Sequence, residues 1–104
     1  MQMIYIDDDI HCERAGPYAT FEGAIAELRR RASIKWDSFP NRAPCTSWRS
    51  CGREYHVLEF DASPERWKLL RKVAVLKVSA KGVEWIEGFE RIWTQSAGDA
   101  ESIP

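Results

Sequence analysis

The sequence predicts an α+β fold: a small, mostly antiparallel sheet of about four strands, with one main amphipathic helix on one face and a short second helix. Three observations predict it. Apolar residues recur at helical spacing over residues 21–32. Short segments rich in β-branched and aromatic residues lie on both sides of that helix. The 104 residues are 44% hydrophobic and 30% charged, which is typical of a single globular domain with a modest core.

The main helix has the strongest local signals. Thr20 is a suitable N-cap, and Glu22 places a negative charge in the first turn, where it favours the helix dipole. The apolar positions are spaced i, i+3, i+4, i+7 and i+11 and form one stripe, which we expect to face the sheet. These positions are Phe21, Ala24, Ile25, Leu28 and Ala32.

Strands are expected before and after this helix. Residues 1–7 read as an N-terminal strand, followed by a polar bend at residues 15–17. Residues 54–60 are rich in strand formers and read as the second strand. Ser63 and Pro64 then favour the start of a short helix that ends near Lys72.

The C-terminal part is expected to form a hairpin. Its strands are residues 73–79 and 83–86, with Gly82 supplying the positive φ of the turn. Residues 89–94 fit either an extension of the last strand or a helical turn, and the sequence does not decide between them. We expect the domain to span residues 1–94 and the small, polar residues 95–104 to form a flexible tail.

Charge is distributed unevenly along the chain. Residues 1–27 hold six acidic residues and one basic residue, whereas residues 28–53 hold seven basic residues and one acidic residue. The net charge of −1 and the pI near 6.1 disfavour a dedicated nucleic-acid-binding protein. No basic leader and no apolar run of membrane-spanning length is present, so we expect a cytoplasmic protein without a membrane partner.

The segment of residues 35–53 is the main candidate for function. It combines aromatic residues, prolines and arginines, and Arg with Trp is the composition of protein-binding hot spots. A purely structural alternative is that Trp36, Phe39 and Trp48 pack over the edge of the core. The candidate partner-binding residues are Trp36, Arg42, Trp48, Arg49 and Arg53.

The three cysteines allow other chemistry. Cys45 and Cys51 with His56 on the next strand could form a thiol enzyme or redox centre, since nearby arginines would favour the thiolate. Their spacing matches neither a CxxC redox motif nor the usual zinc pairs. A metal site would also need ligands from Cys12, His11 and His56. We expect reduced cysteines, no cofactor and no metal.

The acidic run of Asp7, Asp8 and Asp9 also has two interpretations. It could ligate a hard cation, but three acids at the end of a strand more often solvate the chain and protect a sheet edge.

The leading hypothesis from the sequence is a non-catalytic protein-binding domain, by analogy a bacterial inhibitor or toxin-neutralising immunity protein. The alternatives are the thiol centre and a metal or small-ligand sensor. Pairing into a homodimer stays open.

Overall fold

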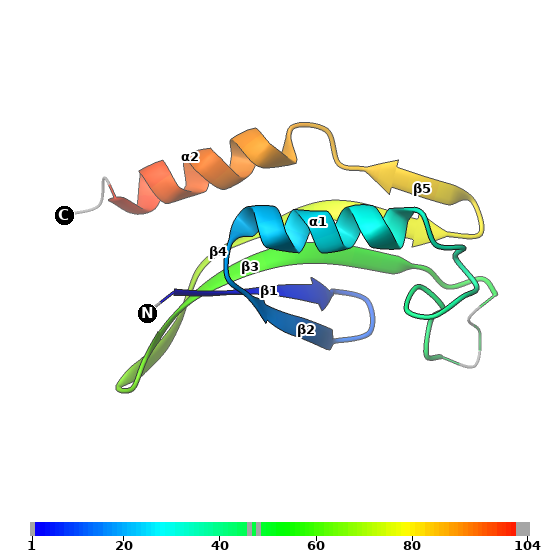
Figure 1. The fold of residues 1–104 in the computed structure, drawn as a ribbon, viewed down its shortest axis with the longest axis horizontal. Coiled ribbons are helices and arrows are strands. Elements are labelled where there is room, and N and C mark those ends of the chain that lie inside the picture. Colours follow the sequence, from blue (N-terminus) through cyan, green and yellow to red (C-terminus); the bar gives the residue numbers. More distant parts are fainter. Residues whose placement is uncertain (1, 46, 48, 102–104) are drawn as a thin grey trace.

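The computed structural model of the chain describes residues 2–45, 47 and 49–101. It contains a five-stranded sheet of order β2-β1-β3-β4-β5, in which every neighbouring pair is antiparallel, and two helices (Figure 1). The predicted α+β class is confirmed. In chain order the elements are β1 Gln2–Asp8, β2 Glu13–Tyr18, α1 Phe21–Ala32, β3 Arg53–Ser63, β4 Arg66–Ser79, β5 Gly82–Trp85 and α2 Phe89–Glu101.

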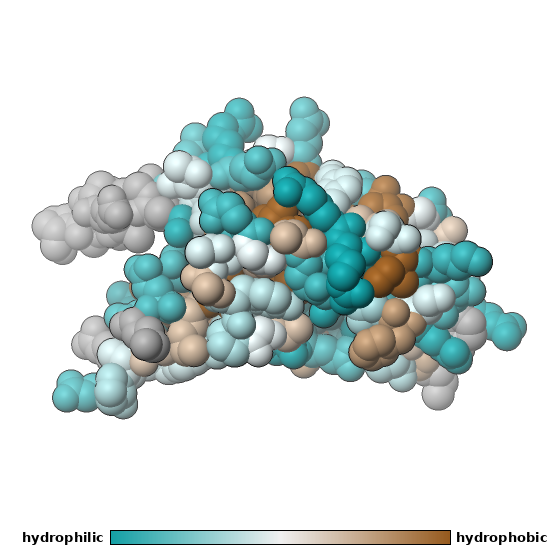
Figure 2. All heavy atoms as spheres, in the orientation of Figure 1, coloured by the Kyte–Doolittle hydropathy of each residue, from teal (hydrophilic) through white to brown (hydrophobic). Residues whose placement is uncertain are grey.

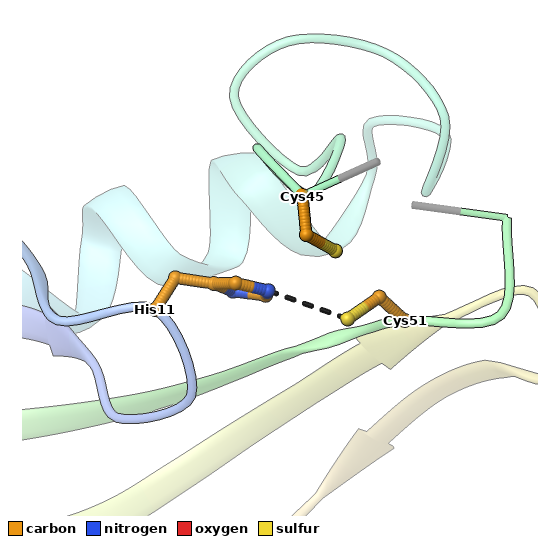
Figure 3. A group of neighbouring side chains, drawn as sticks. All are labelled: His11, Cys45 and Cys51. Carbon is orange, nitrogen blue, oxygen red and sulfur yellow. Dashed lines mark hydrogen bonds between the residues drawn. The ribbon is translucent and has the colours of Figure 1, made fainter. Parts of the chain in front are cut away.

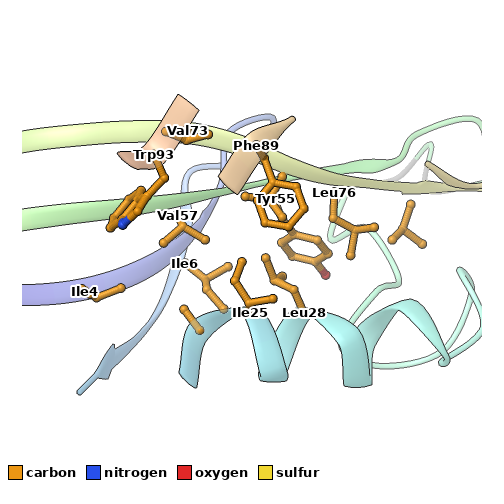
Figure 4. Packing of buried hydrophobic residues seen from close by; sticks show 13 residues of the cluster. Ile4, Ile6, Ile25, Leu28, Tyr55, Val57, Val73, Leu76, Phe89 and Trp93 are labelled. Carbon is orange, nitrogen blue, oxygen red and sulfur yellow. The ribbon is translucent and has the colours of Figure 1, made fainter. Parts of the chain in front are cut away.

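Helix α1 forms as predicted and covers one face of the sheet. The backbone N–H of Gly23 donates to Thr20 Oγ1 at 3.0 Å, which confirms Thr20 as the N-cap. The predicted apolar stripe packs against inward-facing residues of β1, β3 and β4 (Figure 4). Hydrophilic side chains cover much of the outward surface of α1 (Figure 2), on which Arg29 and Arg30 are exposed. This division into an apolar and a polar face holds α1 on the sheet.

The C-terminal helix α2 adds to the same core. Phe89 and Trp93 are buried, and the Trp93 ring stacks on Phe21 of α1 with centroids 4.5 Å apart. The alternative left open for residues 89–94 is therefore decided in favour of a helix. The helix continues to Glu101, so it includes most of the expected tail. The flexibility of residues 95–104 stays a prediction, and residues 102–104 lie outside the described part.

Two local predictions were wrong. The expected bend at residues 15–17 lies within β2, which pairs with β1 at the edge of the sheet. The expected short helix over residues 63–72 is instead the turn and first half of the β3–β4 hairpin, paired out to Ser63 and Arg66. Trp67 packs across the hairpin on Phe60 with centroids 5.1 Å apart. Cross-strand aromatic packing outweighed the local helix signals.

The other expected strands are confirmed. Strand β3 begins one residue before the predicted boundary, and β4 and β5 form a hairpin in which Gly82 has a φ of +122°. Between α1 and β3 the chain forms turns without a helix or strand in the described residues 33–45, 47 and 49–52, as the long predicted loop requires. Neither helix in the described part of the chain has the length and apolar run needed to cross a bilayer.

A candidate Cys/His centre at the end of the sheet

The long loop meets the β1–β2 turn at one end of the sheet, and three side chains converge there. Figure 3 shows His11 from the turn pointing toward Cys45 and Cys51 from the loop. The two sulfurs and a ring nitrogen lie within 4.8 Å of one another. His11 Nε2 is 3.3 Å from Cys51 Sγ. We call these three residues the Cys/His centre.

The ring of His11 is oriented by Asp8. Its Nδ1 lies 2.6 Å from Asp8 Oδ2, so Nδ1 carries the proton that it donates to the carboxylate. In the neutral ring this leaves the lone pair of Nε2 facing the thiols. Desolvation lowers the pKa of His11, but the hydrogen bonds with Asp8 and Cys45 outweigh it and raise this pKa above its ordinary value.

Asp8 is held in place by β1 and its surroundings. Its side chain is 1% exposed, and it faces the core side of the sheet after Ile4 and Ile6 in the strand alternation. The carboxylate accepts from Arg53 Nη1 at 2.8 Å and from the backbone N–H of Ile10 at 3.0 Å. A buried carboxylate needs such donors and an opposite charge to stay ionised.

Arg53 connects this carboxylate to the loop. Its side chain is 8% exposed and also makes an ion pair with Glu13 of β2. The same guanidinium donates to the carbonyl oxygens of Asn41 at 3.2 Å and Arg42 at 2.8 Å. Arg53 thereby fixes the beginning of the cysteine-bearing part of the loop against β3.

Asn41 fastens the loop on its other side. Its Nδ2 donates to the carbonyl oxygens of Arg31 and Ile34, at 2.7 and 2.9 Å, where α1 ends. The hydroxyl of Tyr55 donates to Asn41 Oδ1 at 3.0 Å. The Asn41 side chain therefore adds a donor to carbonyls at and just after the end of α1 and ties the loop to the core.

Cys51 is positioned through the next residue. A Cβ atom on Gly52 would lie 2.8 Å from the carbonyl oxygen of Val78 and 2.9 Å from the Ser79 Cβ. Glycine thus allows the backbone to approach β4 closely at this point. Cys51 is held beside the sheet, with its sulfur toward His11.

The pKa values of the two thiols shift in opposite directions. A hydrogen bond from the Cys51 thiol, together with one from the Ser47 hydroxyl at 3.6 Å, lowers the pKa of Cys45 to about 7. The same bond raises the pKa of Cys51. Cys12 follows His11 directly but is exposed and lies outside the Cys/His centre. The centre thus offers one thiolate near neutral pH, a second thiol and the imidazole of His11.

The histidine beside the cysteines is His11, in place of the predicted His56. His56 lies near Glu54 and Asp9, with its Nε2 3.5 Å from Glu54 Oε2 and 3.9 Å from Asp9 Oδ2. Because side chains alternate along β3, Glu54 and His56 point away from the face that carries Tyr55 and the core. The sequence placed His56 correctly on the strand after the loop. On that strand its side chain points to the face opposite that of Tyr55.

The predicted partner-binding residues differ in how exposed they are in the structure. Arg53 is buried instead of projecting from the surface, and Trp36 packs partly buried against the core. Arg42 and Arg49 lie on the exposed loop, and Trp48 lies outside the described residues. Whether this loop binds a protein stays a prediction.

Sequence reasoning missed the residues that support the centre. Asp8 was read as a solvated acid, although the spacing of Ile4, Ile6 and Asp8 already places it on the core side of a strand. Asn41 had no signal of its own in the sequence. Its role depends on where the loop crosses the end of α1.

Comparisons with protein-family models, with curated proteins and with solved structures found no match for this chain. The chemistry of the site is therefore the basis for a functional proposal.

Proposed function

We propose that this protein binds one zinc ion through His11, Cys45 and Cys51. The observation that carries the proposal is the convergence of two sulfurs and an imidazole nitrogen within 4.8 Å, from two separate segments of the chain. Thiolate and imidazole are the ligands that zinc prefers in proteins. This proposal departs from the expectation of no metal that the cysteine spacing alone favoured.

The distances fit a tetrahedral zinc site after small movements of the three ligand atoms. With Zn–S near 2.3 Å and Zn–N near 2.0 Å, two ligand atoms of such a site lie about 3.5–3.8 Å apart. The separation of 3.3 Å between His11 Nε2 and Cys51 Sγ is close to this range. The ligand atoms need to move by about 1 Å or less to surround an ion.

The surroundings of His11 also support zinc. A metal-bound histidine commonly donates its other ring N–H to a carboxylate, which fixes the tautomer and makes the ligating nitrogen more basic. Asp8 occupies this position, and Arg53 in turn holds Asp8. Three protein ligands leave the fourth position to water or to a group from a bound partner, as in catalytic or exchangeable zinc sites.

Zinc stoichiometry tests the proposal. Protein reduced, stripped with a chelator and titrated with zinc against a chromophoric chelator is expected to bind one ion per chain. Cys51→Ser and His11→Asn are expected to weaken binding at least about tenfold, because each removes a ligand. Cys12→Ser is the matched control, since this thiol is exposed and outside the centre. Equal affinity in all variants would contradict the proposal.

A second candidate function is protein binding through the loop of residues 35–53, in the cytoplasm, where the thiols would stay reduced. One observation favours it: Phe39 is 90% exposed on this loop, so its ring is available to a partner. By analogy, such a domain could act as an inhibitor or an immunity protein, or pair with a second copy.

Phe39→Ser and Arg49→Glu test this second function. Both are expected to lose a partner that the wild-type chain retains from its host, as identified by mass spectrometry. Trp67→Ser is the matched control, because Trp67 is 55% exposed but lies on the β3–β4 hairpin. Retention by both loop variants, or loss in the control alone, would exclude the loop as the binding surface.

A further inference from the structure

We propose that Cys45 and Cys51 are also a reversible redox couple, which a hydroperoxide converts to a disulfide with release of the bound metal. The metal-release half of this inference rests on the proposed zinc site, whereas disulfide formation does not. The proposal stands on the proximity of the two sulfurs, on the way the loop is anchored, and on the position of His11.

The sulfurs are close enough to bond after a local movement. They lie within 4.8 Å of each other, and a disulfide requires about 2.05 Å. Both cysteines are free in the structure and partly exposed, so a small oxidant can reach them. Five residues separate them in the sequence, so closing a ring between the two thiols costs little chain entropy.

The backbone next to Cys51 is more firmly fixed than that next to Cys45. Cys51 is followed by Gly52, whose close approach to β4 fixes the backbone there. Asn41 and Arg53 fasten the two ends of the cysteine-bearing segment by buried hydrogen bonds. We therefore expect Cys45, rather than Cys51, to move when the disulfide forms, while α1 and the sheet stay in place.

The reaction balances with a hydroperoxide as the only oxidant. One thiolate sulfur attacks the terminal oxygen, the O–O bond breaks, and the alcohol or water leaves with a proton while a sulfenic acid forms. The second sulfur attacks this sulfenic sulfur, the S–S bond forms, and the S–O bond breaks to release water with the remaining thiol proton. Two thiols and one hydroperoxide thus give a disulfide, an alcohol and water.

His11 has a definite role in this step. Its Nε2 is 3.3 Å from Cys51 Sγ, so it can accept the thiol proton as the sulfur attacks, while Asp8 holds the other ring nitrogen. The disulfide removes two anionic ligands from the centre, since the thiolate is the form that binds metal. A lone imidazole does not retain zinc against a chelator.

The test uses zinc-loaded full-length protein, hydrogen peroxide as the oxidant and a chromophoric zinc indicator. Wild type and Cys12→Ser are expected to release one zinc per chain and to lose two titratable thiols together, with an intact mass lower by two hydrogens. A dithiol reductant is expected to restore the thiols and zinc binding. Peptide mapping is expected to find the Cys45–Cys51 bond.

Other outcomes would overturn the inference. Oxygen addition to single cysteines without a Cys45–Cys51 bond, or a disulfide between Cys12 and either Cys45 or Cys51, would show that Cys45 and Cys51 are not a redox couple.

The same oxidation, run on metal-free protein, separates this inference from the proposed zinc site. If that protein forms the bond but never binds zinc, the proposed function fails and the couple stands. If it binds zinc but forms no bond, only the couple fails.

Discussion

Two histidine–carboxylate groups lie at the same end of the sheet, and they differ in what faces them. On the core side, Asp8 holds His11, whose free nitrogen points at two thiols. On the opposite face, Asp9 lies near His56 but makes its ion pair with Lys72, and this bond lowers the pKa of Asp9. Both groups contain three potential metal ligands.

The difference shows why residue type alone does not define a site. The lysine ammonium already provides the positive charge that a cation would bring to Asp9. In the core-side group the counter-charge of Asp8 comes from Arg53, which donates to the same carboxylate oxygen as His11, while His11 Nε2 and the sulfurs face one another. The orientation of the cation relative to the ligands, together with burial, separates the candidate centre from its neighbour.

The largest expected effect is on stability. Arg53→Met would leave the carboxylate of Asp8 buried without its charge partner and free the loop carbonyls that Arg53 binds. We expect a loss of about 3–5 kcal/mol in the free energy of unfolding, measured by urea denaturation. A loss below about 1 kcal/mol would show that Asp8 does not depend on this arginine.

The next effect concerns metal affinity. Asp8→Asn would weaken the hydrogen bond that orients His11, and zinc affinity is expected to fall about 10–100-fold in a competition titration. Asp9→Asn is the matched control, since it makes the same change in the neighbouring group. Circular dichroism of both variants would show whether each keeps the wild-type fold. An equal loss in the two variants would remove the distinction between the groups.

The pH dependence of the core-side group follows from its thiols. Zinc competes with protons for the sulfurs, and the pKa of Cys45 is about 7. Affinity is therefore expected to fall at least about tenfold between pH 7 and pH 6, because Cys51, whose pKa is raised, must lose its proton in addition to Cys45. Isothermal titration in two buffers of different ionisation enthalpy would detect the released protons. A pH-independent affinity would exclude thiolate ligation.

The smallest effect is expected on the opposite face. Lys72→Met removes the partner of Asp9, but this pair is exposed and screened by solvent. We expect the midpoint of urea unfolding and the zinc stoichiometry to stay unchanged within error. A second zinc ion appearing in this variant would instead reveal that Lys72 blocks a genuine site.

The sequence predicted the elements whose signals are local. Periodicity and the Thr20 cap located α1, and Gly82 located the β4–β5 turn. It failed where cross-strand pairing outweighs the signals within one segment, as in β2 and in the long β3–β4 hairpin. Beside Cys45 and Cys51, the structure places His11 where the sequence had suggested His56. Which histidine meets them depends on the sheet order that brings the β1–β2 turn beside the loop.

The most direct test of the central claim is the absorption spectrum of the cobalt-substituted protein, because cobalt reports both thiolate ligation and tetrahedral geometry. The account predicts sulfur-to-cobalt charge-transfer bands and tetrahedral ligand-field bands in wild type and Cys12→Ser, with weaker charge transfer in Cys45→Ser or Cys51→Ser. A spectrum without charge-transfer bands, or one unchanged in the Cys45 and Cys51 variants, would contradict metal binding by this centre.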